Sequence, residues 1–186
     1  MGLKSQFPVL LTPHLMLREI EFTDSYVMHE IFSDEESMKW YGMMPVESME
    51  QTIRLIENLR MNYYENRGIR WAIEHRATGA FIGTCGFHNW NLMSRRAEIG
   101  YEISKDYWGL GYCTEALREM RAFGIDAMNL HRVEALVYPE NIGSQRVLEK
   151  LDFKREGLLE GYAYFRNVYQ DLTMFGWINE QHMRRD

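Results

Sequence analysis

The sequence predicts a single α+β domain, with mixed α/β character, built on one mixed sheet. In the central third of the chain the hydrophobic spacing changes from three and four residues to strict alternation, which is typical of successive strands. A glycine-containing turn then opens a helix that leads to another apolar strand, which indicates a crossover with parallel pairing. The length of 186 residues and the hydrophobic fraction of 46% suit one well-filled domain. We therefore expect six or seven strands and about four helices.

The first half of the expected domain is mainly helical. After an N-terminal arm (residues 1–13), a strand is expected over residues 14–20 and a short helix, capped by Thr-Asp, over residues 23–31. A longer helix opens at Ser48 and ends near the Asn-Arg-Gly signal of residues 66–68. Apolar residues recur through it at spacings of three and four, namely Ile53, Ile56, Leu59 and Tyr63.

An antiparallel meander follows. Residues 69–74 alternate between apolar and polar, residues 76–79 read as a hairpin turn, and the chain returns as a strand over residues 81–90. A third strand covers residues 96–104, where apolar and polar side chains take opposite faces. Its two faces are Ala97, Ile99, Tyr101 and Ile103 on one side, and Glu98, Gly100 and Glu102 on the other.

The last third contains the crossover and the closing strands. A helix opens after residues 109–111 and a strand follows over residues 132–138, so these elements form one strand–helix–strand unit. Another helix covers residues 141–151. Two closing strands are expected over residues 153–165 and 168–177. The domain then spans residues 14–178, and residues 179–186 form a C-terminal tail.

Composition excludes several classes of function. There are 21 basic against 27 acidic residues, a net charge of −6, which argues against a broad nucleic-acid surface. Two cysteines are too few for a disulfide framework or a zinc site, so no metal is expected. No apolar run reaches the roughly 18–20 residues of a membrane span, and the first residues lack the pattern of a secretory signal. We expect a cytoplasmic monomer or homodimer that binds neither membrane nor nucleic acid.

The turn at residues 109–111, Gly-Leu-Gly, carries the clearest chemical signal. Free N–H groups and the positive end of the helix dipole make such a helix start an anion site, and glycine lets a phosphate approach closely. A P-loop is excluded because no Gly-Lys-Ser/Thr follows. A dinucleotide fingerprint would need a small residue where Thr114 stands. From this motif alone, a tight turn without a ligand remains the alternative.

Three segments together resemble the GNAT acetyltransferases, and within them the members that acetylate the N-termini of ribosomal proteins. They are residues 97–101 (Ala-Glu-Ile-Gly-Tyr), 107–112 (Tyr-Trp-Gly-Leu-Gly-Tyr) and 141–153, which begins Asn-Ile-Gly-Ser. The resemblance extends over residues 14–177. It implies the GNAT fold, a sheet whose middle strands splay apart, with acetyl-CoA as co-substrate and an amine as acceptor.

The resemblance also implies the residues that hold the co-substrate. The strand ending near Ile103 would offer backbone groups to the pantetheine arm, the glycine turn would hold the pyrophosphate, and Asn141 would contact the cofactor arm. The full set is Ile103, Trp108, Gly109, Leu110, Gly111, Tyr112, Cys113, Thr114 and Asn141.

The catalytic residues depart from the common family pattern. Many members carry a tyrosine acid seven residues after the asparagine, where this chain has Leu148. Ribosomal-type members instead use a serine, which corresponds to Ser144. Its helical spacing to Leu148 places it on the inward face, although a small residue chosen for packing is the alternative. Some relatives carry a glutamate base where Ala163 stands, so we expect Glu98, acting through water, to replace it.

Two alternatives to these roles stay open and a third is excluded. Glu98 could equally be a salt-bridged strand carboxylate. His88, on the preceding strand, is a second candidate base, although a packed and hydrogen-bonded histidine is the commoner case. A nucleophilic Cys113 is rejected, because no His–Asp arrangement accompanies it in the sequence.

The expected reaction is direct acetyl transfer, within a ternary complex, to the α-amine of a protein N-terminus. Such an amine has a pKa of about 7.7–8.0 and is partly neutral near pH 7, whereas a lysine amine at about 10.4 needs far more help. The resemblance implies the alanine N-terminus of a ribosomal protein as acceptor. The alternatives are a small-molecule N-acetyltransferase for polyamines, aminoglycosides or amino-acid-like amines, and a non-catalytic CoA-binding sensor.

Overall fold

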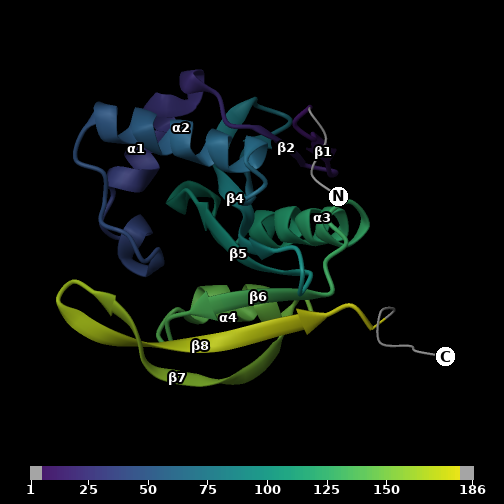
Figure 1. The fold of residues 1–186 in the computed structure, drawn as a ribbon. Helices are drawn as coiled ribbons and strands as arrows, with labels where there is room; N and C mark the ends of the chain where they lie inside the picture. The colour runs from purple at the N-terminus through teal and green to yellow at the C-terminus, as the bar shows by residue number, and fades with distance from the viewer. Residues whose placement is uncertain (1–5, 181–186) are drawn as a thin grey trace.

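One mixed sheet of eight strands runs through the described part of the protein (Figure 1). The computed structural model describes residues 6–180. In spatial order the strands are β1-β2-β3-β4-β5-β6-β8-β7. Their bounds are β1 (Leu10–Leu11), β2 (Leu15–Glu19), β3 (Ile69–His75), β4 (Ala80–Asn91), β5 (Arg96–Ile103), β6 (Arg132–Val137), β7 (Lys154–Phe165) and β8 (Val168–Ile178). The strand beyond the expected six or seven is β1, which is only two residues long and pairs antiparallel with β2.

Within residues 6–180, four α-helices accompany the sheet, as expected. They are α1 (Ser25–Ser33), α2 (Met49–Tyr64), α3 (Tyr112–Asp126) and α4 (Ile142–Glu149), and short 3-10 turns occur at η1 (Phe22–Asp24), η2 (Ser37–Trp40) and η3 (Lys105–Tyr107). The Ser48 side chain caps α2 by accepting from the backbone of Gln51. At the end of the α4 segment, Asp152 takes a left-handed φ of 62°, a conformation that aspartate tolerates better than most residues.

The two faces of the sheet are covered by different helix pairs (Figure 1). Helices α1 and α2 form a small core with Ala72 and Phe81. The larger core lies on the other face, where Trp71 and Ile99 pack with residues of α3 and α4. Because successive side chains of a strand point to opposite faces, each central strand contributes to both layers.

The sheet opens in its middle, between β5 and β6. These strands pair in parallel, as the crossover predicts, but the pairing covers just three positions and ends at Glu98↔Glu134. β5 continues to Ile103 and β6 to Val137 without pairing with each other, and β6 instead pairs along its whole length with β8. Figure 1 shows β6, β8 and β7 leaving the plane of β4 and β5. The splayed sheet that the resemblance implies is therefore present.

The segment before β2 packs onto this sheet instead of standing away from it. The Trp71 indole donates to the carbonyl oxygen of Pro8 at 2.9 Å, and Phe7 is buried against the main core. At the other end, the backbone N–H of Asn179 donates to the carbonyl of His131 at 2.8 Å. Residues 1–5 of the expected arm and 181–186 of the expected tail lie outside the described residues. Among the described helices, none combines the length and apolarity needed to cross a bilayer.

Candidate active site

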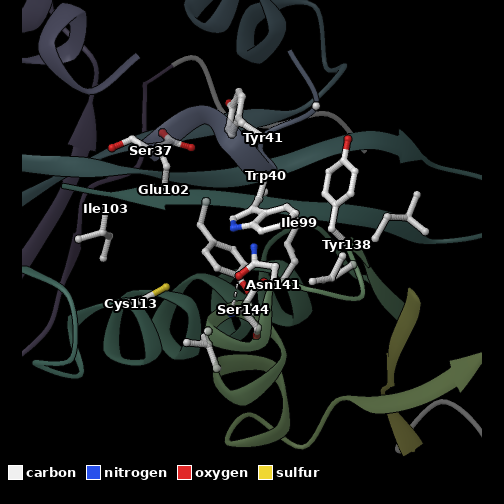
Figure 2. Close-up of a pocket in the computed structure, with 18 of the residues that line it drawn as sticks. Ser37, Trp40, Tyr41, Ile99, Glu102, Ile103, Cys113, Tyr138, Asn141 and Ser144 are labelled. Carbon is white, nitrogen blue, oxygen red and sulfur yellow. Dashed lines mark hydrogen bonds between the residues drawn. The ribbon is translucent and has the colours of Figure 1, made fainter. Parts of the chain in front are cut away.

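A cavity of about 1060 Å³ lies where β5 and β6 diverge. Because the strands part there, the cavity is reached from both faces of the sheet. The α3 side contributes the turn before α3 and the start of α4, and the α1 side contributes η2 with Trp40 and Tyr41. Figure 2 shows Ser144 and Asn141 on one side of β5, with Glu102 and Tyr41 on the other.

The start of α3 has the geometry of an anion site. Gly109 and Gly111 take left-handed φ values of 74° and 86°, and a Cβ at either would meet no atom within 4 Å. Whereas side chains cap α2 and α4, none caps α3 within the described chain. The first intrahelical hydrogen bond of α3 runs from the Glu115 N–H to the carbonyl of Gly111 at 3.0 Å. The N–H groups of residues 112–114 precede this bond and have no partner within the helix. A phosphate fits this open, positively polarised turn.

Basic side chains lie next to the same turn. A smaller hollow beside the main cavity is lined by Gly111 and Thr114 together with Arg118 and Lys150. Leu110 and Tyr112 also line this hollow, whereas the main cavity takes the other predicted cofactor residues. The turn thus offers backbone donors on one side and two cations on the other, which suits a ligand with more than one phosphate.

Two predicted cofactor residues make contacts that sequence reasoning missed. Trp108, which is 53% exposed, donates its indole N–H to the carbonyl of Ile103 at 2.6 Å. Asn141 caps α4, since its Oδ1 accepts from the backbone N–H of Ser144 at 3.1 Å. Burial raises the pKa of the Cys113 thiol, so this cysteine is a neutral part of the cavity wall.

Ser144 points inward and meets a tyrosine from the sheet. Its Oγ lies 2.6 Å from the hydroxyl of Tyr101 on β5. Burial raises the pKa of Tyr101, so this hydroxyl stays protonated. Leu148, at the family's tyrosine position, is completely buried in the main core. Tyr101 is therefore the phenol nearest to the predicted acid, and sequence reasoning read it only as part of an apolar face.

Glu98 lies on the other face of β5, across from His88 on β4. The Nε2 of His88 is 3.4 Å from Glu98 Oε2, and Asn89 donates to Glu98 Oε1 at 3.1 Å. Asn89 has a φ of 49° at an irregularity of the β4–β5 register, a kind of bulge that is common beside active sites. The hydrogen bond from His88 outweighs burial and lowers the pKa of Glu98, so Glu98 is an ionised carboxylate and a weak proton acceptor.

A buried ionic cluster on the same face was not predicted. Arg70 forms an ion pair with Glu102 and donates through Nε to Thr84 Oγ1 at 2.7 Å, and the Thr84 hydroxyl donates to the second oxygen of Glu102. The guanidinium lies against Gly100, where an added Cβ would come within 2.9 Å of Arg70 Nη1. Glycine at position 100 is thus explained by the side chain that crosses it. Nothing in the sequence links these partners, which come from three strands.

Away from the glycine turn, the cavity lining includes several aromatic and acidic side chains. The rings of Trp40 and Tyr138 lie 5.5 Å apart, and Tyr164 and Phe165 also line this part. Ala163 lines it as well, so the position that bears a carboxylate in some relatives is apolar here. The carboxylates that line the cavity are Glu36, Glu98, Glu102 and Glu140, of which Glu102 is paired with Arg70. Among residues 6–180, no cluster of side chains is placed to hold a metal ion.

Comparisons with known proteins agree with this geometry. The sequence profile described as "Acetyltransferase (GNAT) domain" matches residues 14–154. The "Uncharacterized N-acetyltransferase YoaA" of Bacillus subtilis is 40% identical over 169 residues, which is 91% of this chain and 96% of that protein. The solved structure of "Mycobacterium smegmatis RimJ in complex with CoA-disulfide" superposes with a TM-score of 0.83 at 26% identity, covering 96% of this chain and 89% of the other.

More distant relatives differ in the acceptor that their names give. The "Putative ribosomal N-acetyltransferase YdaF" of Bacillus subtilis is 26% identical over 94% of this chain and 97% of its own length. A "Spermidine N(1)-acetyltransferase" of Vibrio cholerae is 23% identical over 94% of this chain and 99% of its own length. The relatives therefore agree on the transferred group more closely than on the acceptor.

Proposed function

Because the chain belongs to the GNAT acetyltransferase family and is thereby an acetyl-CoA-dependent acyltransferase, we propose that it acetylates the α-amine of a protein N-terminus. Residues 14–178 form the catalytic domain in this proposal. The uncapped start of α3, with two left-handed glycines, at the edge of the cavity where β5 and β6 diverge, supports the acetyl-CoA part of this proposal. The weakly basic Glu98, 3.4 Å from His88, supports an α-amine as the acceptor. One substrate is a polyphosphate thioester and the other an amine, and the cavity has a matching side for each.

The co-substrate side is assigned to the turn and the start of α4. The N–H groups of residues 112–114 would hold the pyrophosphate of acetyl-CoA, with Arg118 and Lys150 beside it. Ile103, Trp108 and Asn141 line the path from this turn to the start of α4. Bound acetyl-CoA supplies the activated acetyl group. The protein contributes position and dipoles, which suffice for much of the catalysis of acyl transfer.

The acceptor side is assigned to the aromatic and acidic half of the cavity. The amine lone pair forms the new N–C bond, the C–S bond breaks, and its electron pair leaves on sulfur. The proton released from nitrogen passes to water held beside Glu98 and His88, while the Ser144 hydroxyl donates a hydrogen bond to the leaving sulfur. An ionised Glu98 is a weak base. Weak assistance is enough for an α-amine with a pKa of about 7.7–8.0, but not for a lysine amine at about 10.4.

Thiol release from acetyl-CoA tests this proposal. The protein is mixed with acetyl-CoA and one of three acceptors, which are a peptide that begins with alanine, an N-terminally blocked peptide with one lysine, and spermidine. We expect release with the alanine peptide and, near pH 7, little with the lysine peptide. Thiol release with spermidine alone would mean that the acceptor is a polyamine and not a protein N-terminus. Measurable CoA binding without release for any amine would contradict the enzymatic proposal.

A further inference from the structure

The hydroxyl pair of Tyr101 and Ser144 joins two elements at the centre of the cavity. Tyr101 comes from β5 and Ser144 from the first turn of α4, and their oxygen atoms are 2.6 Å apart. Both residues line the cavity, together with the turn that precedes α3. A neutral O–H···O bond of this length is at the short end of the usual range, so the contact is well formed.

The donor in this pair follows from the partners of each oxygen. In the described part of the chain, the acceptors within reach of the Tyr101 hydroxyl are both on Ser144, the Oγ at 2.6 Å and the backbone carbonyl at 3.4 Å. A buried hydroxyl proton without an acceptor would cost about 1–3 kcal/mol. Either oxygen can be the donor in this contact; donation from Tyr101 to the nearer acceptor, Ser144 Oγ, satisfies the phenol proton and leaves the proton of Ser144 to point elsewhere.

The side chain of Asn141 fixes the backbone at Ser144. The Ser144 N–H donates to the capping Oδ1 of Asn141 at 3.1 Å, which fixes the first turn of α4. With the N–H held by Asn141 and Oγ accepting from Tyr101, the remaining direction for the hydroxyl proton is the cavity. Hydrogen bonds in such a chain polarise one another, so a serine that accepts from a phenol is a better donor.

We propose that Tyr101 is a positioning residue, which orients and polarises the Ser144 hydroxyl toward the sulfur that leaves in acetyl transfer. The inference rests on the proposed function. In this proposal a tyrosine on β5 assists the leaving sulfur through Ser144, whereas many family members use a tyrosine on the helix, at the position of Leu148. No proton leaves Tyr101 in the step. The C–S electron pair departs on sulfur, the serine hydroxyl hydrogen-bonds to that charge, and the phenol hydrogen-bonds to the serine oxygen.

Burial of the phenol is consistent with Tyr101 as a hydrogen-bond donor and not as the acid. A buried phenolate would be strongly disfavoured, so Tyr101 acts as a permanent donor and does not itself supply the proton. Mutual orientation of two neutral hydroxyls also requires no change in charge on the co-substrate side of the sheet. The acid–base groups, Glu98 and His88, remain on the opposite face of β5.

A double-mutant cycle tests the inference. The variants are Tyr101→Phe, Ser144→Ala and their combination, with kcat and KM from thiol release, CoA affinity from calorimetry, and melting temperature. Tyr63→Phe is the matched control, because it likewise removes a hydrogen-bonded phenol hydroxyl from a tyrosine packed in the main core. The Tyr63 hydroxyl donates to the carbonyl oxygen of Gln6 at 2.8 Å, and Tyr63 does not line the cavity. We expect Tyr101→Phe to lower kcat about tenfold, as for the loss of one hydrogen bond of roughly 1.4 kcal/mol.

Non-additivity is the decisive result. If Tyr101 acts through Ser144, the double variant should be no slower than Ser144→Ala alone, with CoA affinity and both KM values within twofold of the unaltered protein. A loss in the double variant equal to the product of the single losses would overturn the inference, as would an unchanged kcat in Tyr101→Phe. An unaltered protein that binds CoA but releases no thiol would overturn the proposed function, and this inference with it.

A second replacement covers the case in which Tyr101→Phe fails to fold. Incorporating 3-fluorotyrosine at position 101 keeps the ring and its hydroxyl but makes the hydroxyl a stronger donor. The inference requires this change to alter kcat when Ser144 is present and to have no effect in the Ser144→Ala background. An equal change in both backgrounds would contradict it.

Discussion

Replacing Gly111 by alanine separates the cost of backbone strain from the loss of phosphate binding. Gly111 has a φ of 86°, and an added Cβ meets no protein atom within 4 Å, so the substitution causes no clash. The left-handed conformation costs an L-residue about 1–2 kcal/mol, and the stiffer unfolded chain returns about 0.4–1 kcal/mol. The net loss of about 1 kcal/mol lowers Tm by roughly 2–4 °C in a chain of this size.

The effect on CoA should be larger. The new methyl group would stand in open space at the turn, and we expect it to obstruct a phosphate bound by the first N–H groups of α3. Losing one charge-assisted hydrogen bond costs about 1.5–3 kcal/mol, which corresponds to a roughly 10- to 150-fold weaker Kd. Calorimetric titration with CoA measures this, and Tm is recorded in parallel.

Gly79→Ala is the matched control for this experiment. Gly79 also has a left-handed φ, 69°, and an added Cβ there again meets nothing within 4 Å, but it lies in the β3–β4 turn and lines neither hollow. We expect the same small loss of Tm and an unchanged CoA affinity. If Gly111→Ala binds CoA as tightly as Gly79→Ala, the assignment of the turn to the pyrophosphate is wrong.

Three further predictions concern buried and charged groups. Glu102→Gln leaves the Arg70 charge without its ion-pair partner in the interior, so it should cost about 3–5 kcal/mol of stability, whereas Glu36→Gln, at an exposed carboxylate, should leave Tm nearly unchanged. Because the pKa of Glu98 is lowered on folding, its contribution to stability is present above the unfolded pKa of about 4.3 and is lost as pH falls through the lower folded value. Glu98→Gln should therefore flatten the dependence of Tm on pH below about 4.5, and melts that still fall as steeply as those of the unaltered protein would contradict this. Finally, burial raises the pKa of both cysteine thiols, so iodoacetamide at pH 8 should label the native protein far more slowly than the unfolded protein, as read by mass spectrometry.

The sequence was sufficient for features whose signals are local. Alternation of apolar and polar residues predicted the central strands, and a serine followed by an apolar stripe predicted α2. The order strand–helix–strand predicted the parallel pairing of β5 with β6. The turn of residues 109–111 could also be located, because glycines before a helix are a local signature, and its binding of an anion stays a prediction. By contrast, β1 was missed because Leu10 and Leu11 are too short a run to show any period.

Contacts between distant segments could not be predicted. Tyr101 and Ser144 are 43 positions apart, and Arg70 and Glu102 are 32 apart. Ser144 was singled out as the predicted acid, but Tyr101, Arg70 and Glu102 looked ordinary in their own strands. Tyr101 shared a face with aliphatic residues and was read as core, although a buried tyrosine on such a face needs a partner for its hydroxyl. That unmet need is the one signal that would have directed attention to it.

The divergence of β6 gives β5 its central place in the site. Where β6 leaves, after Glu98, both faces of β5 line the cavity, and strand alternation divides its residues between the two faces. Tyr101 and Ile103 belong to the side of the glycine turn, whereas Glu98 and Gly100 belong to the acidic and aromatic side. A shift of one residue in the register of β5 would exchange these sets, so under the proposed function the carboxylate would face the phosphates and the phenol would face the amine. The buried Arg70–Glu102 ion pair joins β3 to β5 across β4, and we infer that it holds this register. A buried ion pair between β3 and β5 would then determine which half of the cavity each residue of β5 lines.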